Sequence, residues 1–188
     1  LDFSKIQAGK MDYYIEQHNL MDLLNEEVEQ QMSLAEKEGI FLHLENVDLP
    51  INAYYDDLRL RQVIRNILNN AIKYNNPNGN VKVWVEPLDT AKFVRIFFQD
   101  TGKGISKEEQ SKVFNEFETL GKVALHHKGT GLGMPISQQM MLSMGGLISL
   151  ESDTGKGSTF WVDVPTNKVL DESMYRKRPG QDDDLAAI

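Results

Sequence analysis

Cysteine is absent from the sequence, and its absence excludes several kinds of chemistry. A chain without thiols has no disulfide, no thiolate zinc site and no cysteine nucleophile. Long hydrophobic runs are missing as well, because the apolar stretches extend over only a few residues, whereas a membrane-spanning helix needs ~20. We therefore expect a cytoplasmic chain that makes no membrane contact of its own.

Positive charge is also scarce, with 20 Lys and Arg residues against 28 Asp and Glu residues and a net charge of −8. Proteins that bind nucleic acids through the phosphates normally present a basic surface, so we expect no nucleic-acid partner. An anionic ligand would need locally focused positive charge. The length of 188 residues and the hydrophobic content of 40% suit a single domain with short appendages.

Hydrophobic spacing predicts a series of helices and strands. After a short extended piece at residues 11–18, residues 22–38 show helical spacing, and residues 40–46 alternate as in a half-buried strand. A second helix starts from a cap at Asp56 or Asp57 and ends before the turn NNPNGN. The other predicted elements are a hairpin of residues 81–86 and 92–98, a short helix from Ser106 to Phe117, a helix from about Met134 to Met144, and a hairpin of residues 147–152 and 158–164.

The order of these elements indicates the fold class. Helices and hairpins follow one another without the regular alternation that builds a parallel sheet. We therefore predict a two-layer α+β sandwich, in which a mixed, mostly antiparallel sheet carries helices on one face. The stretch LGKVALHHKGTGLG, residues 120–133, is too rich in glycine for regular structure and is a candidate mobile loop.

The second long helix carries an unusual polar face. Asn66, Asn70 and Lys73 lie four and three residues apart, so they fall within roughly 60° of one another on the side away from the apolar stripe. Spacing alone favours an ordinary solvated face. Asparagine, however, is a mediocre helix former, and its side-chain carbonyl suits Mg²⁺ that also takes phosphate oxygens. Lys73 would then neutralise phosphate.

Glycine-rich stretches leave more than one interpretation open. The sequence GTGLG, residues 129–133, leads into a helix whose N–H groups could hold an anion, but it matches neither common nucleotide-binding pattern. Taken alone, GKGST at residues 155–159 is typical of a hairpin turn. The hexapeptide DTGKGI, residues 100–105, carries an acid that would repel phosphate. None of these stretches identifies a ligand by itself.

Taken together and in order, these stretches resemble one family. The motifs NILNNAIKYN, DTGKGI, VFNEFE, GTGLGM and GKGSTF are similar to the N, G1, F, G2 and G3 boxes of the catalytic ATP-binding domain of sensor histidine kinases, a member of the GHKL superfamily with the Bergerat fold. LDFSKIQAGKM resembles the end of the helical hairpin that precedes this domain. The resemblance implies that residues 1–10 end the dimerisation and phosphoacceptor hairpin, 11–165 form the ATP-binding domain and 166–188 are a tail or linker.

The resemblance also implies a role for individual residues. Asn66 and Asn70 match ligands of Mg²⁺, and Lys73 matches a phosphate-contacting lysine; Asn66 and Lys73 would serve the reaction. Asp100 matches the adenine-binding aspartate, whose ionised carboxylate accepts from the N6 amine of adenine and would discriminate against guanine. Phe114 and Phe117 match the F box, where core packing is an additional role. The other implied nucleotide-binding residues are Tyr74, Gly102, Gly104, Ile105, Phe117, Lys128, Gly129, Thr130, Gly131, Leu132, Gly133 and Thr159.

A sensor histidine kinase transfers the γ-phosphoryl group of ATP to a histidine in a helical motif. The four histidines, His18, His43, His126 and His127, lack that context, so we expect this sequence to be part of a longer kinase. The resemblance implies ATP and Mg²⁺ as ligands, and the phosphoacceptor hairpin and a response regulator receiver domain as partners. It further implies a homodimeric parent protein, of which this chain would be the cytoplasmic part of a membrane-bound sensor.

Two alternatives remain open. A GHKL-type ATPase would hydrolyse ATP, but such enzymes usually place a glutamate as general base where this chain has Asn66, and an amide cannot accept that proton. A non-catalytic adenine-nucleotide-binding module would bind ATP without transferring phosphate to any acceptor.

Overall fold

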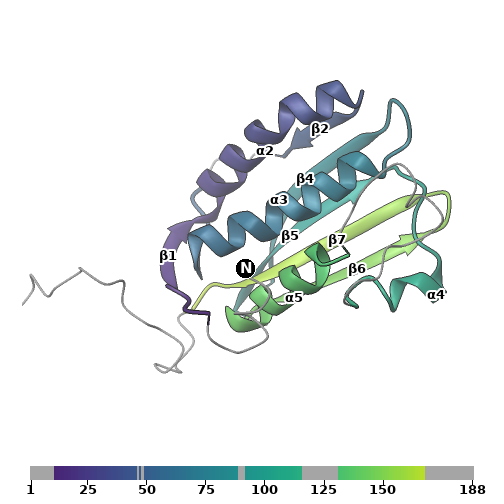
Figure 1. Ribbon diagram of the computed structural model, residues 1–188. Coiled ribbons are helices and arrows are strands. Elements are labelled where there is room, and N and C mark those ends of the chain that lie inside the picture. The colour runs from purple at the N-terminus through teal and green to yellow at the C-terminus, as the bar shows by residue number, and fades with distance from the viewer. Residues whose placement is uncertain (1–10, 46, 48, 89–91, 116–130, 168–188) are drawn as a thin grey trace, which may run out of the picture.

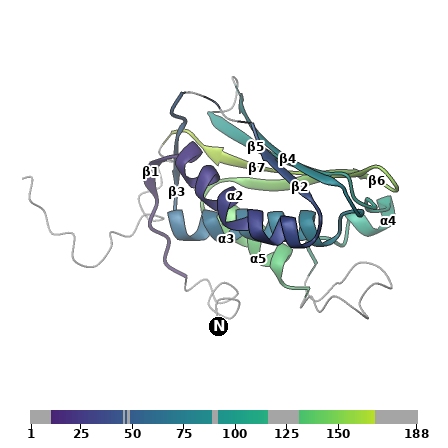
Figure 2. The same cartoon turned by 90° about the horizontal axis from the view of Figure 1, so that it is seen from above.

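The computed structural model describes residues 11–45, 47, 49–88, 92–115 and 131–167. A five-stranded sheet carries its helices on one face, and the view from above shows the sheet as one layer and the helices as the other (Figures 1 and 2). This arrangement confirms the predicted two-layer α+β sandwich. The elements are β1 Glu16–Asn19, α2 Leu20–Lys37, β2 Phe41–Leu44, β3 Asn52–Tyr55, α3 Asp57–Lys73, β4 Asn80–Leu88, β5 Phe93–Asp100, α4 Lys107–Gln110, α5 Gly133–Ser143, β6 Leu147–Asp153 and β7 Gly157–Pro165.

The sheet is mixed, with the strand order β2-β4-β5-β7-β6. Strand β2 runs parallel to β4, whereas the other three pairings are antiparallel. The two predicted hairpins are the pairs β4-β5 and β6-β7. A separate two-stranded ribbon joins β1 to β3, and the sequence predicted only an extended piece near β1 and no strand at β3.

The core lies between the sheet and helices α2, α3 and α5. Strand residues alternate across the sheet, so Val83, Ile96 and Val162 are buried in one core cluster with apolar residues of the helices. The opposite face carries a row of half-buried aromatic side chains, in which Trp84 stacks on Phe97 with ring centroids 4.7 Å apart and Trp161 follows at 6.4 Å from Phe97. This second face is the open face of the sheet.

Two helix ends can be compared with their predicted caps. Asp56 caps α3, because its Oδ1 accepts from the backbone N–H of Arg59 at 3.1 Å, and its Oδ2 accepts from the N–H of Tyr14 at 2.8 Å. Ser106 caps α4 by accepting from the N–H of Glu109. The prediction that this helix continues to Phe117 was wrong in its described part, because α4 ends at Gln110 and turns follow to residue 114.

No helix in the described part of the chain is long and apolar enough to cross a membrane.

Candidate functional site

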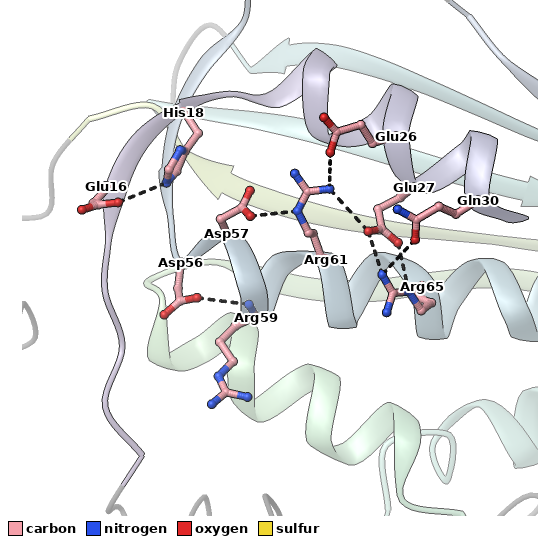
Figure 3. Close-up of polar contacts among 10 residues, drawn as sticks. All are labelled: Glu16, His18, Glu26, Glu27, Gln30, Asp56, Asp57, Arg59, Arg61 and Arg65. Carbon is pink, nitrogen blue, oxygen red and sulfur yellow. Dashed lines mark hydrogen bonds and ion pairs between the residues drawn. The ribbon is translucent and has the colours of Figure 1, made fainter. Parts of the chain in front are cut away.

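Helix α3 carries the predicted polar face, and a buried ionic cluster holds it against α2. Glu27 of α2 is fully buried and accepts from Arg65 Nε at 3.1 Å and Nη2 at 2.9 Å (Figure 3). Arg61 lies one turn earlier and reaches Glu26 at 2.7 Å and Asp57 at 2.8 Å. Because a buried charge is costly unless it is paired, these contacts fix how α3 sits on α2.

Asn66 lies next to Arg65 and faces the start of α5. Its Nδ2 donates to Ser137 Oγ at 3.0 Å and lies 3.4 Å from Met134 Sδ. These contacts direct the amide nitrogen into α5. The side chain also lies so close to Gly133 that a Cβ there would come within 2.5 Å of Asn66 Oδ1. The structure thus brings together two predicted site residues, Asn66 and Gly133, and glycine is needed for the approach.

The rest of the polar face continues to the end of α3. Asn70 is half-buried, and its carbonyl accepts from the N–H of Tyr74 at 3.0 Å as the helix ends. Lys73 and Tyr74 are exposed. The four-residue and three-residue steps place Asn66, Asn70 and Lys73 along one side of the helix, as predicted.

Asp100 ends β5, and its carboxylate is the best-defined group of the candidate site. Oδ1 accepts from the N–H of Gly102 at 2.8 Å and from the N–H of Ser158 at 3.3 Å. Burial raises the pKa of Asp100 above the usual range, and these two hydrogen bonds oppose the increase because they favour the ionised form. Both of these hydrogen bonds are accepted by Oδ1, and no hydrogen bond to Oδ2 is found among the described residues.

The loop after Asp100 is fastened to the β6-β7 hairpin. Lys103 O accepts from the N–H of Gly155 at 2.7 Å, and the N–H of Ile105 donates to Ser152 Oγ at 2.8 Å. Gln110 Nε2 donates to the carbonyls of Ile105 and Ser152 at 2.9 and 2.7 Å. Gly104 has a φ of +69°, and a Cβ at this residue would collide with the carbonyl of Asp153.

This loop also lies against the end of α3. A Cβ on Gly102 would come within 2.6 Å of the carbonyl of Tyr74, and Lys103 Nζ lies 5.7 Å from the centroid of the Tyr74 ring. The resemblance to the kinase family implied that Gly102 and Gly104 bind the nucleotide. In the structure, the groups that crowd both glycines belong to the protein itself, namely Tyr74 and Asp153.

Thr159 does not join the other site residues. Its Oγ1 accepts from Gln99 Nε2 at 3.4 Å, and it alternates along β7 with the buried Ser158 and Phe160, on the same face as Trp161. The residue that contacts Asp100 is Ser158, which the sequence interpretation missed. Its signal was present, since Ser158 directly precedes Thr159 in the GKGSTF motif.

Four predicted site residues, Phe117, Lys128, Gly129 and Thr130, lie outside the described residues, as does most of the predicted loop. Gly131 has a φ of +67°, and Leu132 precedes α5 without a side-chain cap. The first N–H groups of α5 are therefore not capped by Leu132. Phe114 packs against the core, as the second interpretation of the F box predicted.

Comparison with known proteins places this geometry in a family. Residues 55–168 match the histidine kinase-, DNA gyrase B-, and HSP90-like ATPase family. The chain is 37% identical over 169 residues to the signal transduction histidine-protein kinase BarA of Escherichia coli strain K12, covering 87% of this chain and 18% of that protein. It is 34% identical over 177 residues to the sensor histidine kinase GacS of Pseudomonas protegens, covering 92% of this chain and 19% of that protein.

Solved structures show the same fold. A full-length structure of ShkA in complex with AMPPNP matches with a TM-score of 0.76 and 25% identity, over 87% of this chain and 33% of that chain. The nucleotide-free catalytic domain of the histidine kinase ThkA matches with a TM-score of 0.70 and 27% identity, over 83% of this chain and 97% of that domain.

The curated relatives are much longer than this chain, which spans 18% of BarA and 19% of GacS. The family match covers residues 55–168 and includes Asn66, Asn70, Asp100 and the start of α5, so the sequence motifs and the folded site point to the same group of proteins. The chain belongs to the histidine kinase-, DNA gyrase B-, and HSP90-like ATPase family and is similar to the catalytic domains of sensor histidine kinases.

Proposed function

We propose that this chain is the ATP-binding catalytic domain of a sensor histidine kinase and that it presents the γ-phosphoryl group of ATP to a histidine elsewhere in a longer protein. The observation that carries the proposal is the carboxylate of Asp100. It is a half-buried acid between two fastened loops, and two backbone N–H groups hold its Oδ1. Oδ2 then remains to accept a hydrogen bond from the N6 amine of adenine.

A carboxylate at this place favours adenine over guanine. An ionised carboxylate only accepts hydrogen bonds, whereas guanine presents an acceptor oxygen where adenine has its amine. Tyr74, a residue that is 37% exposed, lies beside the loop and offers an aromatic surface for the base and ribose. The structure of the relative ShkA with AMPPNP, an adenine nucleotide, supports the same ligand class.

The other end of the nucleotide would lie along α3 and the start of α5. Lys73 supplies positive charge, and the N–H groups at the start of α5, which Leu132 does not cap, suit phosphate oxygens. For Mg²⁺, the donors that fit are the side-chain oxygens of Asn66 and Asn70. The contacts of Asn66 Nδ2 with Ser137 and Met134 support this assignment, because they engage the amide nitrogen and leave Oδ1, beside Gly133, without a hydrogen bond among the described residues.

Phosphoryl transfer depends mainly on positioning and on neutralisation of charge. Bound Mg²⁺ would neutralise part of the triphosphate charge. The residues of α3 would hold the γ-phosphoryl group towards the acceptor, whose imidazole nitrogen forms the new bond to phosphorus while the bond to the β–γ bridging oxygen breaks and ADP leaves. The hairpin that carries the acceptor, a receiver domain of a response regulator and a second copy of the parent protein are the proposed partners.

The proposed boundaries and location follow from the same resemblance. Residues 11–165 would form the ATP-binding domain, residues 1–10 would end the phosphoacceptor hairpin, and residues 166–188 would be a tail or linker. The domain would work in the cytoplasm as part of a membrane-bound sensor.

The decisive experiment is calorimetry with ADP, ATP and GTP on the wild-type chain and on Asp100→Asn. We expect the wild type to prefer adenine nucleotides. The variant should bind ADP ten- to a hundredfold more weakly, about 1.5 to 3 kcal/mol, because it loses an ionised hydrogen-bond acceptor. Asp153→Asn is the matched control, since its carboxylate is 60% exposed on the hairpin and pairs with Lys156. Equal affinity for GTP would overturn the adenine assignment.

The two alternative functions are separated by the fate of the phosphate. A hydrolase would turn over ATP rapidly in the isolated chain, although Asn66 cannot act as its general base. A purely binding module would bind ATP but would transfer no phosphate even when the phosphoacceptor hairpin is supplied in trans. The kinase should phosphorylate that added hairpin, and the isolated chain should acquire no acid-labile phosphate.

A further inference from the structure

A group of side chains outside the predicted site joins the end of α3 to the loop after Asp100. Thr101 Oγ1 donates to Asn75 Oδ1 at 3.1 Å and accepts from the N–H of Asn80 at 2.9 Å. Asn75 Nδ2 donates to the carbonyls of Ala71 and Asn80 at 3.1 and 3.0 Å. We call the pair Asn75 and Thr101 the brace.

Neighbouring groups hold the brace in one arrangement. Asn76 Nδ2 donates to the carbonyl of Thr101 at 2.8 Å, so the backbone of the loop is tied to the residue after Asn75 as well. Gly79 packs directly on the brace, since a Cβ there would collide with Asn75 Oδ1 and come within 2.7 Å of Thr101 Oγ1. Every hydrogen-bonding atom of the Asn75 and Thr101 side chains thus has a defined partner.

The loop after Asp100 therefore has two separate supports. The β6-β7 hairpin supports it through Ser158, Gly155 and Ser152, and these contacts shape the surroundings of the Asp100 carboxylate. The brace supports it from the other side and ties it to α3, the helix of Asn66, Asn70 and Lys73. Together with the contacts of Gly102 and Lys103 with Tyr74, the brace therefore connects the adenine end of the proposed site directly to the helix of the metal and phosphate end.

We propose that Asn75 and Thr101 are positioning residues that set the separation between the Asp100 loop and the polar face of α3. This inference rests on the proposed function, since it concerns a ligand that binds at both ends. A nucleotide gains its full affinity only when the second end meets its partners without rearrangement of the first. Adenosine, which has no phosphate, would contact Asp100 and Tyr74 but not Asn66, Asn70 or Lys73, so its binding depends less on that separation.

The test is Thr101→Val, which keeps the shape of the side chain but removes its hydroxyl. We expect Mg²⁺-ADP to bind about three- to tenfold more weakly by calorimetry, because a neutral hydrogen bond that fixes the geometry is lost. Adenosine binding, measured by ligand-observed NMR, should change less than twofold. Thr101→Ser, which retains the hydroxyl, should restore Mg²⁺-ADP affinity to the wild-type value. Thr166→Val is the matched control, since the hydrogen bond found for Thr166 among the described residues comes from its backbone N–H, to the carbonyl of Lys92, and not from its hydroxyl.

A second variant reaches the brace without removing a hydrogen-bonding group. Gly79→Ala places a methyl group against Asn75 and Thr101 and should give the same loss for Mg²⁺-ADP and not for adenosine. It keeps the test valid if Thr101→Val fails to fold, which thermal melting of the nucleotide-free variants would reveal.

The outcomes separate the inference from the function on which it rests. An unchanged Mg²⁺-ADP affinity in Thr101→Val and Gly79→Ala would overturn the positioning role of the brace. An equal loss of affinity for adenosine would overturn it as well. Failure of the wild type to bind ADP, or an Asp100→Asn variant that binds ADP normally, would overturn the proposed function instead.

Discussion

Asp100 combines two opposed influences on one carboxylate. Burial raises its pKa, while the N–H groups of Gly102 and Ser158 stabilise the ionised form and limit that increase. Protonation of this group changes its chemistry, since the ionised form can only accept hydrogen bonds and Oδ2 would then accept from the adenine amine.

This balance predicts a pH dependence of binding. The folded pKa of Asp100 lies above that of an ordinary aspartate, so the carboxylate becomes protonated at a higher pH than an exposed one when the solution is acidified. Adenine-nucleotide affinity should be complete above this raised pKa and should fall as the pH drops through it. Calorimetry of ADP binding at successive pH values, compared between the wild type and Asp100→Asn, isolates the effect because the protonation of ADP itself is common to both.

The raised pKa of Asp100 also determines how the free energy of unfolding of the nucleotide-free chain changes with pH. A carboxyl whose folded pKa exceeds its unfolded pKa contributes stability below the unfolded value, and that contribution is lost as the pH rises through the folded value. As the pH rises from the unfolded to the folded pKa of Asp100, the free energy of unfolding of the wild type should therefore fall relative to that of Asp100→Asn. For ADP binding, in contrast, a wild-type affinity that depends on pH as little as that of Asp100→Asn would contradict the assignment of Asp100 to the adenine base.

For single residues, motifs in the sequence predicted the members of the site, whereas the contacts between them could not be predicted. Asp100, Asn66 and Gly133 were identified from motifs, and Asn66 and Gly133 do meet in the structure. Ser158 was missed in favour of Thr159, because the choice depends on which face of β7 each side chain occupies, and that face is set by pairing with β5. The Asn75 and Thr101 brace joins segments 26 residues apart, a separation that local spacing does not indicate.

Among the elements, α3 carries most of the proposed site, and its position depends on α2. Glu27 is fully buried between the two helices, whereas Arg61 and Arg65 are 22% and 47% exposed at their side chains. The carboxylate therefore provides the fixed centre, and the two guanidinium groups reach it from the surface. Arg65 precedes Asn66 directly, so this cluster anchors the helix next to the first predicted Mg²⁺ ligand, whose own side chain contacts Ser137 of α5.

We expect Glu27→Gln to lower the free energy of unfolding by about 1 to 3 kcal/mol. Removing one partner of a buried ion pair leaves the other without compensation, and the partial exposure of both arginines reduces the loss. Urea denaturation of the nucleotide-free chain measures the difference. Glu29→Gln, an exposed position on the same helix, is the matched control and should stay within ~0.5 kcal/mol of the wild type. Equal stability of the two variants would show that the cluster does not hold the helices together.

Long elements with clear periodicity were predictable, and short ones with distant partners were not. Helix α3 has a continuous apolar stripe, and the β4-β5 hairpin alternates over eight paired residues, so both could be predicted from the sequence. Strand β3 has only four residues, and its partner β1 lies more than 30 residues earlier in the chain. Helix α4 was predicted too long because its cap was clear but its end was not marked by a distinct stop residue.

For the molecule as a whole, the proposed site joins three parts of the fold: α3, the loop after β5 and the start of α5. A ligand that contacts all three should stabilise the folded chain in proportion to its affinity and concentration, because it binds the folded and not the unfolded form. Adenosine, which contacts fewer of these parts, should stabilise it less than ADP does. Thermal melting can therefore report on the complete site without any assay of phosphoryl transfer.

The metal provides the last test at this scale. We expect Mg²⁺-ADP to raise the melting temperature more than ADP in excess EDTA, because the metal would link the phosphates to Asn66 and Asn70. In Asn70→Ala this difference between Mg²⁺ and EDTA should shrink, whereas stabilisation by adenosine should be unchanged. Asn25→Ala is the matched control, because it makes the same substitution at an exposed position of another helix, α2, away from the polar face of α3. A loss of Mg²⁺ dependence in both variants, or in neither, would remove Asn70 from the metal site while leaving the adenine assignment of Asp100 to be judged by its own experiment.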